Sequence, residues 1–220
     1  MKIQGFLDHL LKSAQGNGGG NANASGAGGL SGMLNADFGK GALAGGALGL
    51  LLGKNKTTRK LATYGGLAAI GVMAYKAYGD YKQQQGGAGA GAEPQTVDRL
   101  PPPQVELHSQ AILSALVAAA KADGHIDARE RQVIEGEFSR VNQDAELRQW
   151  LHAELEKPLD PAEVARAAAT PEIAAEMYLA SLMAADEQSF MERAYLDELA
   201  RQLKLDDALK LRLEQQLKQA

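Results

Sequence analysis

The chain has 220 residues, a formal net charge of -4 at pH 7 and no cysteine. The absence of cysteine excludes disulfides, thiolate metal sites and cysteine nucleophiles. Aromatic residues make up only 5% of the sequence. Ala, Leu and Gly supply most of the apolar content, and this composition favours helices over a β-sandwich. The length accommodates one domain with appended segments, or two small domains.

Charge is distributed unevenly along the chain. Residues 1–103 carry ten Lys and Arg against five Asp and Glu, whereas residues 104–220 carry thirteen against twenty-two. A basic, Gly-rich front half and an acidic back half indicate different neighbours for the two halves. Because an acidic surface repels phosphate, we expect no nucleic-acid partner for the back half.

Residues 1–14 place apolar side chains at helical spacing, which predicts a short amphipathic helix. Such a helix either binds a membrane interface or a partner, or frays as a terminal helix. Residues 15–35 are rich in Gly and Asn and offer too little apolar surface to offset the loss of backbone entropy, so we expect a disordered linker. The apolar stripe of the first segment consists of Ile3, Phe6, Leu7, Leu10 and Leu11.

Residues 36–82 are predicted to be a membrane-associated helical segment with a glycine zipper. Glycines recur at every fourth residue of its first apolar run and continue into the second. On a helix, such small residues form a face that another helix can approach closely, as membrane helices do. We expect the segment to contact the lipid bilayer and its glycine face to allow self-association. Its glycines are Gly41, Gly45, Gly49, Gly53, Gly65, Gly66 and Gly71.

The two apolar runs leave the membrane topology open. As a helix, residues 61–78 would rise about 27 Å, close to the ~30 Å hydrocarbon core, whereas residues 41–53 would rise only about 20 Å. The alternatives are a single span over 61–78, a membrane-inserted hairpin over 41–78, and a loose hairpin in water. The basic loop 54–60 favours the cytoplasm, so a single span would send the acidic domain outward.

Residues 83–103 are rich in Gly and Pro and are predicted to be a second linker. Helical periodicity begins at Gln104, and we expect an all-α fold with an acidic domain of about seven helices over residues 104–220. Two of these helices should start at a capping residue followed by proline, at Asp160 and at Thr170. The expected helices are 104–122, one that starts at Asp127, 144–157, a short one from Asp160, then 171–185, 190–203 and 206–218.

Two acidic turns in this domain, residues 122–130 and 185–192, form the candidate functional site. The first turn matches the second half of an EF-hand loop, but Ala119 and Lys121 occupy the first two carboxylate positions, which excludes an EF-hand. Carboxylates from both turns could bind a divalent cation, or they could serve as helix caps. The candidate ligands are Asp123, Asp127, Glu130, Asp186 and Glu192.

Three segments together carry a resemblance to a known family. ADGHIDARE, MYLASLMAADEQSFMERAYLDELARQLKL and GLLLGKNKTTRKLATYGGLAAIGVMAYKAY resemble the YebE-type bacterial inner-membrane proteins. The C-terminal part resembles the TerB-like, tellurite-resistance-related helical domain. The resemblance implies an all-α domain, a bacterial inner-membrane location, and metal binding by the acidic residues of the two turns. Glu187 and Phe190 depart from the pattern, because the first turn has Gly and Asp at these positions.

No set of residues matches a catalytic site, so we expect no enzymatic activity. Our main hypothesis is a non-enzymatic, membrane-anchored scaffold or stress-response protein with an unknown protein partner. The competing hypothesis is a cation-binding protein of the tellurite or metal-stress type. The divalent cation is the only cofactor that the sequence suggests.

If the acidic turns bind a cation, titration of residues 104–220 with Ca²⁺, Mg²⁺, Mn²⁺ and Zn²⁺ will give heat with at least one ion. The melting temperature will also rise, because a ligand that binds only the folded state stabilises it. Isothermal titration calorimetry and thermal melting measure the two effects. Neither heat nor a melting shift with any of the four ions would remove the cation site.

Overall fold

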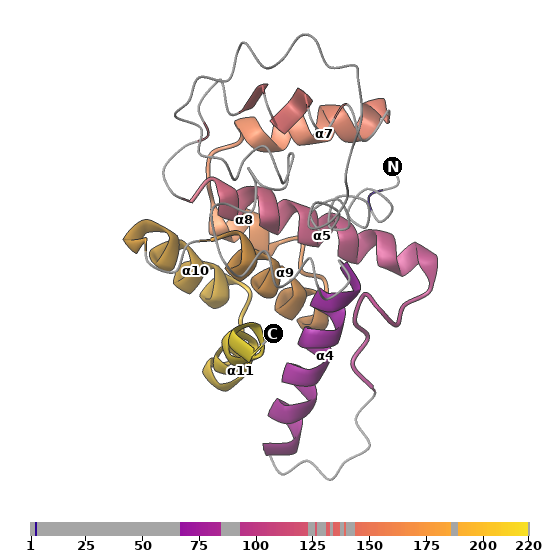
Figure 1. Cartoon of the computed structure of the whole chain (residues 1–220), viewed down its shortest axis with the longest axis vertical. Helices are drawn as coiled ribbons and strands as arrows, with labels where there is room; N and C mark the ends of the chain where they lie inside the picture. The colour runs from indigo at the N-terminus through magenta and orange to yellow at the C-terminus, as the bar shows by residue number, and fades with distance from the viewer. Residues whose placement is uncertain are drawn as a thin grey trace, which may run out of the picture.

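The computed structural model describes residues 3, 67–84, 93–122, 126, 131–132, 134–136, 139, 144–185 and 189–219. These residues contain helices and no strand, which confirms the predicted all-α fold (Figure 1). The expected helix from Asp127 falls mostly outside them. The helices are α4 (Leu67–Gln84), α5 (Pro102–Ala120), α7 (Ala145–Glu156), α8 (Pro161–Ala165), α9 (Pro171–Ala184), α10 (Phe190–Gln202) and α11 (Asp207–Gln219).

The centre of the fold is the contact between α5 and α9. Every residue of α9 from Ile173 to Ala184 is buried, and the helix contacts α4, α5, α10 and α11. A helix that is apolar around its whole circumference needs neighbours on every side, and α9 has them. The many alanines of α5 and α9 let the two backbones approach closely, as the Ala-rich sequences predict.

Local sequence sets where the central helices begin. The side chain of Asp160 accepts a hydrogen bond of 2.9 Å from the backbone N–H of Ala162, and Oγ1 of Thr170 accepts one of 3.3 Å from Ile173. A proline follows each capping residue, and its fixed φ suits the first helical position. Both predicted starts are therefore confirmed.

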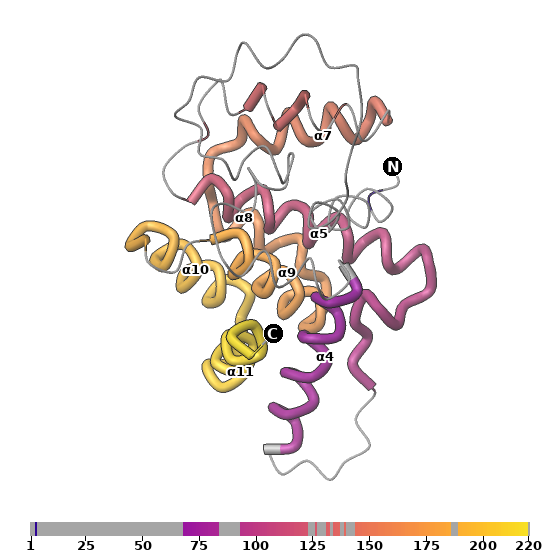
Figure 2. The backbone as a smooth tube through the Cα atoms, viewed as in Figure 1, coloured from indigo at the N-terminus to yellow at the C-terminus, as the bar shows by residue number. Residues whose placement is uncertain are grey.

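The helix α4 packs against α9 and α11, and Figure 2 shows it running beside them. The helical core therefore includes a helix upstream of residue 104, where we expected the domain to begin. The Gly/Pro-rich linker separates α4 from α5 in sequence, but the two helices belong to one packed unit. The buried inner face of α4 consists of Ala69, Ile70, Met73, Ala74 and Ala77.

This packing bears on the predicted span over residues 61–78. Residues 67–78 of that segment belong to α4, and a single span would draw them away from α9 and α11. None of the described helices combines the length and the hydropathy that a bilayer crossing requires. The first half of the segment and the run 41–53 lie outside the described residues.

The turn over residues 96–99 covers α4 at Gly71. A Cβ atom at position 71 would lie 2.4 Å from Oδ1 of Asp98 and 2.9 Å from the Asp98 backbone nitrogen. Thr96 holds the same carboxylate, because its Oγ1 donates a hydrogen bond of 2.6 Å to Oδ1 of Asp98. Gly71 therefore permits the close approach of a turn of the same chain, where the glycine-zipper pattern predicted the approach of another helix.

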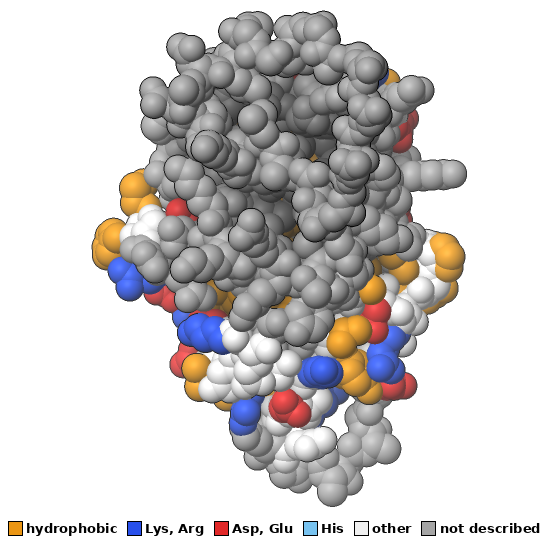
Figure 3. All heavy atoms as spheres, viewed as in Figure 1, with side chains coloured by type: hydrophobic (Ala, Val, Ile, Leu, Met, Phe, Trp, Pro, Cys, Tyr) orange, Lys and Arg blue, Asp and Glu red, His pale blue; other side chains and the backbone are white. Residues whose placement is uncertain are grey.

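The outer surface of the lower half of the molecule carries charges of both signs. Figure 3 shows Lys and Arg side chains interspersed with Asp and Glu side chains over the described part of this face. On α11, Nζ of Lys210 lies 2.6 Å from Oδ1 of Asp197 on α10 and 4.0 Å from Oε1 of Glu214. Because Asp197 is well exposed and Lys210 and Glu214 are partly exposed, solvent screens these pairs, and they contribute little to stability.

Two alanine substitutions within α4 test the packing of the turn on Gly71. Ala is about 1 kcal/mol more favourable than Gly in a helix interior. Around Gly79 nothing lies within 4 Å of the added methyl, so Gly79→Ala is expected to raise the free energy of unfolding by up to about 1 kcal/mol. Gly71→Ala must displace the Asp98 backbone and is expected to lower it by roughly 1–3 kcal/mol.

Chemical denaturation followed by circular dichroism measures both values. An equal gain in stability at the two positions would contradict the close contact between Gly71 and the turn.

Candidate functional site

A groove of ≈ 360 Å³ lies between α5, α7, α8 and the segment that leads into α9. The side chains of Leu107, Ala111 and Ala118 follow one another along one face of α5, since Ala111 comes four residues after Leu107 and Ala118 two helical turns after Ala111. Trp150 of α7 and Leu159 of the α7–α8 connection complete the apolar lining. This volume is at the lower end of the range for ligand pockets in proteins.

Two leucines at the groove are unusually open to solvent. Leu107 is 64% exposed and Leu159 is 37% exposed. A single exposed leucine on a protein surface is ordinary, but these two border the same apolar groove. Their apolar area becomes shielded from water only when another molecule or segment enters the groove, so the groove favours an apolar occupant.

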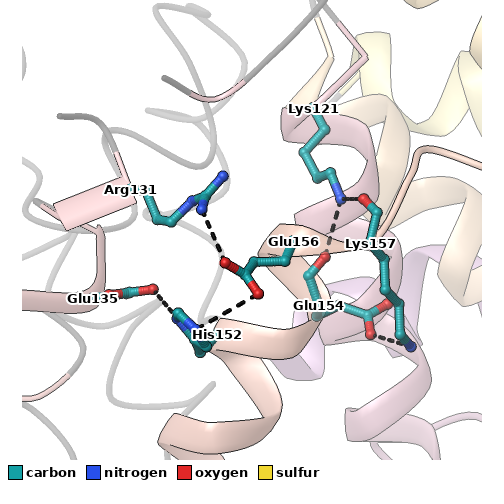
Figure 4. Close-up of polar contacts among 7 residues, drawn as sticks. All are labelled: Lys121, Arg131, Glu135, His152, Glu154, Glu156 and Lys157. Atoms are coloured by element: carbon teal, nitrogen blue, oxygen red, sulfur yellow. Dashed lines mark hydrogen bonds and ion pairs between the residues drawn. The ribbon is translucent and has the colours of Figure 1, made fainter. Parts of the chain in front are cut away.

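Lys121 ends the groove at the C-terminal end of α5. Its Nζ donates hydrogen bonds to the backbone carbonyls of Glu154, at 3.0 Å, and of Lys157 (Figure 4). The last carbonyls of a helix lack intrahelical partners and favour a nearby positive charge, so Lys121 caps α7 from outside. Burial lowers the pKa of the Lys121 ammonium, and the charge of Glu154 partly opposes this shift.

The carboxylate of Glu154 is also fully engaged. It accepts a hydrogen bond of 2.9 Å from Oγ of Ser114 and lies 2.7 Å from Nζ of Lys157, which in turn lies 3.4 Å from Glu163. The hydrogen bond to Glu154 raises the pKa of Lys157. The charged groups at this end of the groove therefore satisfy one another and leave the apolar lining as its distinctive feature.

A second polar cluster lies on the exposed side of α7. Nδ1 of His152 is 2.7 Å from Oε1 of Glu135, and its Nε2 is 3.7 Å from Oε2 of Glu156 (Figure 4). Nη1 of Arg131 is 3.3 Å from Oε1 of Glu156. The hydrogen bond to Glu135, together with the charge of Glu156, raises the pKa of His152. The cluster joins α7 to the helical residues around Glu135.

A histidine–carboxylate pair lies in the core between α5 and α9. Nδ1 of His108 is 2.5 Å from Oε2 of Glu176, whose other oxygen accepts a hydrogen bond of 2.5 Å from the backbone N–H of Val97. Glu176 is 0% exposed, and burial raises the pKa of its carboxyl while the bonds from His108 and Val97 oppose the rise. Neither side chain lines the groove, so the pair serves to hold the turn at Val97 on the core.

Of the five predicted cation ligands, the structure describes only Glu192. Glu192 lies in the first turn of α10, is only 7% exposed, and donates its backbone N–H to Oγ of Ser189 at 3.4 Å. Among the described residues, no three His, Cys, Asp or Glu side chains are grouped to hold a metal ion. The cation site stays a prediction, because Asp123, Asp127, Glu130 and Asp186 lie outside the described residues.

Most of the predicted glycine face is likewise not described. Gly71 is the exception, and its neighbour is the turn at Asp98. Self-association through this face stays a prediction. The members that lie outside the described residues are Gly41, Gly45, Gly49, Gly53, Gly65 and Gly66.

The raised pKa of His152 predicts a measurable pH dependence. The pKa of an unperturbed histidine is about 6.5. The pKa of His152 is expected to lie above this value, because Glu135 and Glu156 favour its charged form. The stability that its charge contributes is complete below the unfolded-state pKa and is lost as pH rises through the higher folded-state pKa. NMR titration of the ring protons measures the folded value.

Glu135→Gln is expected to lower the pKa of His152, whereas Glu163→Gln, which changes a carboxylate outside this cluster, is expected to leave it unchanged. A pKa at or below the ordinary value would contradict the geometry of the cluster.

Comparison with known proteins identifies one family whose model matches most of the chain. The family described as "Protein of unknown function (DUF533)" matches residues 37–217. The chain is also 32% identical over 127 residues to a protein of Yersinia enterocolitica described as an uncharacterized protein in the ampR 5′ region. That match covers 58% of this chain and 90% of the relative. No solved structure matches the chain. The chain therefore belongs to the DUF533 family.

Proposed function

We propose that the protein is a non-enzymatic interaction protein of the bacterial inner membrane, whose helical domain binds an apolar segment of a partner protein. The observation that carries this proposal is the groove between α5, α7 and α8, with its apolar lining and the exposed Leu107 at its border. A groove of this kind suits the apolar face of an amphipathic helix.

The polar groups around the groove favour a protein segment over a small polar ligand. Sites for small molecules usually present a few convergent polar groups that fix the orientation of the ligand. Here Lys121 is bound to the end of α7, and Glu154 is bound to Ser114 and Lys157. Binding to these groups would first require breaking their present hydrogen bonds, whereas the apolar side chains of Leu107 and Leu159 are exposed at the border of the groove.

The buried pair of His108 and Glu176 supports a non-enzymatic role. A general base must lie within hydrogen-bond reach of the substrate proton that it removes. His108 is buried, Glu176 is wholly buried, and neither side chain lines the groove. Their hydrogen bonds instead join α5, α9 and the turn at Val97, which is a structural task.

Membrane attachment is assigned in this proposal to residues 36–66. The resemblance of this region to YebE-type inner-membrane proteins, and its glycine-spaced apolar run, support this assignment. The later apolar residues of α4 are excluded from it, because they pack on α9 and α11. The resemblance of the C-terminal part to TerB-like domains leaves cation binding as the alternative. The titration with divalent cations tests it, provided that the fragment starts before Leu67 and so retains α4.

A photoreactive amino acid at Leu107 tests the groove in living cells. It is expected to form one discrete cross-linked product with a partner protein, because this side chain lies at the border of the groove and is exposed. Leu211 on α11 is a matched control, since it is 54% exposed and does not line the groove. Immunoblotting and mass spectrometry identify the products.

Gln110 is an exposed groove residue, and Gln110→Trp is expected to fill the groove and reduce the product at Leu107 several-fold without lowering the melting temperature. Identical products from Leu107 and Leu211, or a product that Gln110→Trp does not affect, would overturn the assignment of the groove.

A further inference from the structure

The N-terminal end of the chain is held against the start of α5. Ile3 is helical and only 1% exposed, and it belongs to the hydrophobic core. Its backbone N–H donates a hydrogen bond of 2.5 Å to Oε1 of Glu106, although 103 positions separate the two residues in sequence.

Each of these two contacts has a clear physical basis. The first N–H groups of a helix have no intrahelical partner and carry a partial positive charge, so a carboxylate is a favourable acceptor for them. A hydrogen bond to an ionised acceptor is also stronger than one between neutral groups. The side chain of Ile3 is among the largest fully buried side chains of the described structure. Glu106 therefore binds the backbone of Ile3, and the core binds its side chain.

The far end of the intervening chain is held by the same domain. The chain re-enters the described structure at Leu67, the first residue of α4, and α4 packs on α9 and α11. Residues 4–66 are thus a stretch whose two ends contact one packed unit. Because residues 4–66 join these two contacts covalently, binding of the N-terminus to its own domain is an intramolecular event with a high effective concentration. The N-terminus therefore binds its own domain in preference to another copy at lower chain concentrations.

We infer that the start of α5 is a docking site for the chain's own N-terminal segment, so that residues 4–66 leave the helical domain and return to its same side. A chain that crosses a bilayer once must end on the opposite side. The docked N-terminus therefore permits only zero or two complete crossings between residues 4 and 66. This consequence for topology rests on the proposed membrane attachment, whereas the docking itself does not.

The length of the glycine-rich run agrees with a shallow attachment. Residues 41–53 would rise about 20 Å as a helix, less than the ~30 Å hydrocarbon core. With α4 packed on the domain, the second apolar run that a full hairpin needs is reduced to residues 61–66. Attachment within one leaflet of the bilayer is therefore the arrangement that the docked N-terminus favours.

Amide hydrogen exchange of the full-length chain, followed by NMR, tests the docking. The Ile3 amide is expected to exchange at least tenfold more slowly than an unstructured amide, and Glu106→Ala is expected to remove this protection. Glu163→Ala, which changes an exposed carboxylate on α8, serves as the matched control, and the amide of Ile70 inside α4 serves as the internal reference. Unprotected exchange at Ile3 in the natural chain, or no effect of Glu106→Ala, would overturn the docking.

The absence of cysteine allows a second test, on membrane topology. Single cysteines at Lys2 and Leu211 report the N-terminus and α11, and a membrane-impermeant maleimide labels them in intact spheroplasts or in inside-out vesicles. We expect both positions to react from the same side, in a chain that carbonate washing does not extract. Labelling from opposite sides would overturn the inference and keep the membrane attachment. Extraction of the full chain by carbonate would overturn the attachment, and the exchange experiment would still decide the docking.

Discussion

The contact between α5 and α9 is the constraint on which the rest of the fold depends. Because α9 is buried on all sides, α4, α10 and α11 must all pack around it. The remaining face of α5, on which Leu107 and Gln110 are exposed, becomes one wall of the groove. The buried carboxylate of Glu176 adds a polar link to this arrangement, since it binds His108 of α5 and the backbone at Val97 together. The pair of α5 and α9 thus positions both the groove and the turn over residues 96–99 that covers α4.

Local features of the sequence predict the helices well. Proline after a capping residue marks the starts of α8 and α9, and periodicity places α5, α7, α10 and α11 within a few residues of their bounds. The destination of α4 was not predictable in the same way. Its alanines, Ile70 and Met73 suit lipid and a protein core equally, because both environments are apolar. Only the tertiary contact with α9 and α11 shows that α4 lies in the protein core.

At the candidate functional site, too, local features were predictable and long-range contacts were not. The acidic turns stand out in the sequence because their carboxylates are close neighbours along the chain, and most of these residues lie outside the part that the structure describes. The groove escaped prediction because its walls come from α5, α7, α8 and two connections. The pair of His108 and Glu176, and the contact of Ile3 with Glu106, join residues 68 and 103 positions apart. Periodicity and spacing are local properties, so they carry no signal of such contacts.

The position of α4 in the chain has a consequence for synthesis on the ribosome. α4 ends at Gln84, but its partners α9 and α11 begin only at Pro171 and Asp207. At roughly 5–20 residues per second, the apolar face of α4 waits on the order of 5–20 s before α9 emerges. During this interval the nascent chain displays an uncovered apolar helix next to the glycine-rich run. The apolar face of α4 is therefore accessible to factors that bind exposed apolar segments before α9 and α11 can cover it.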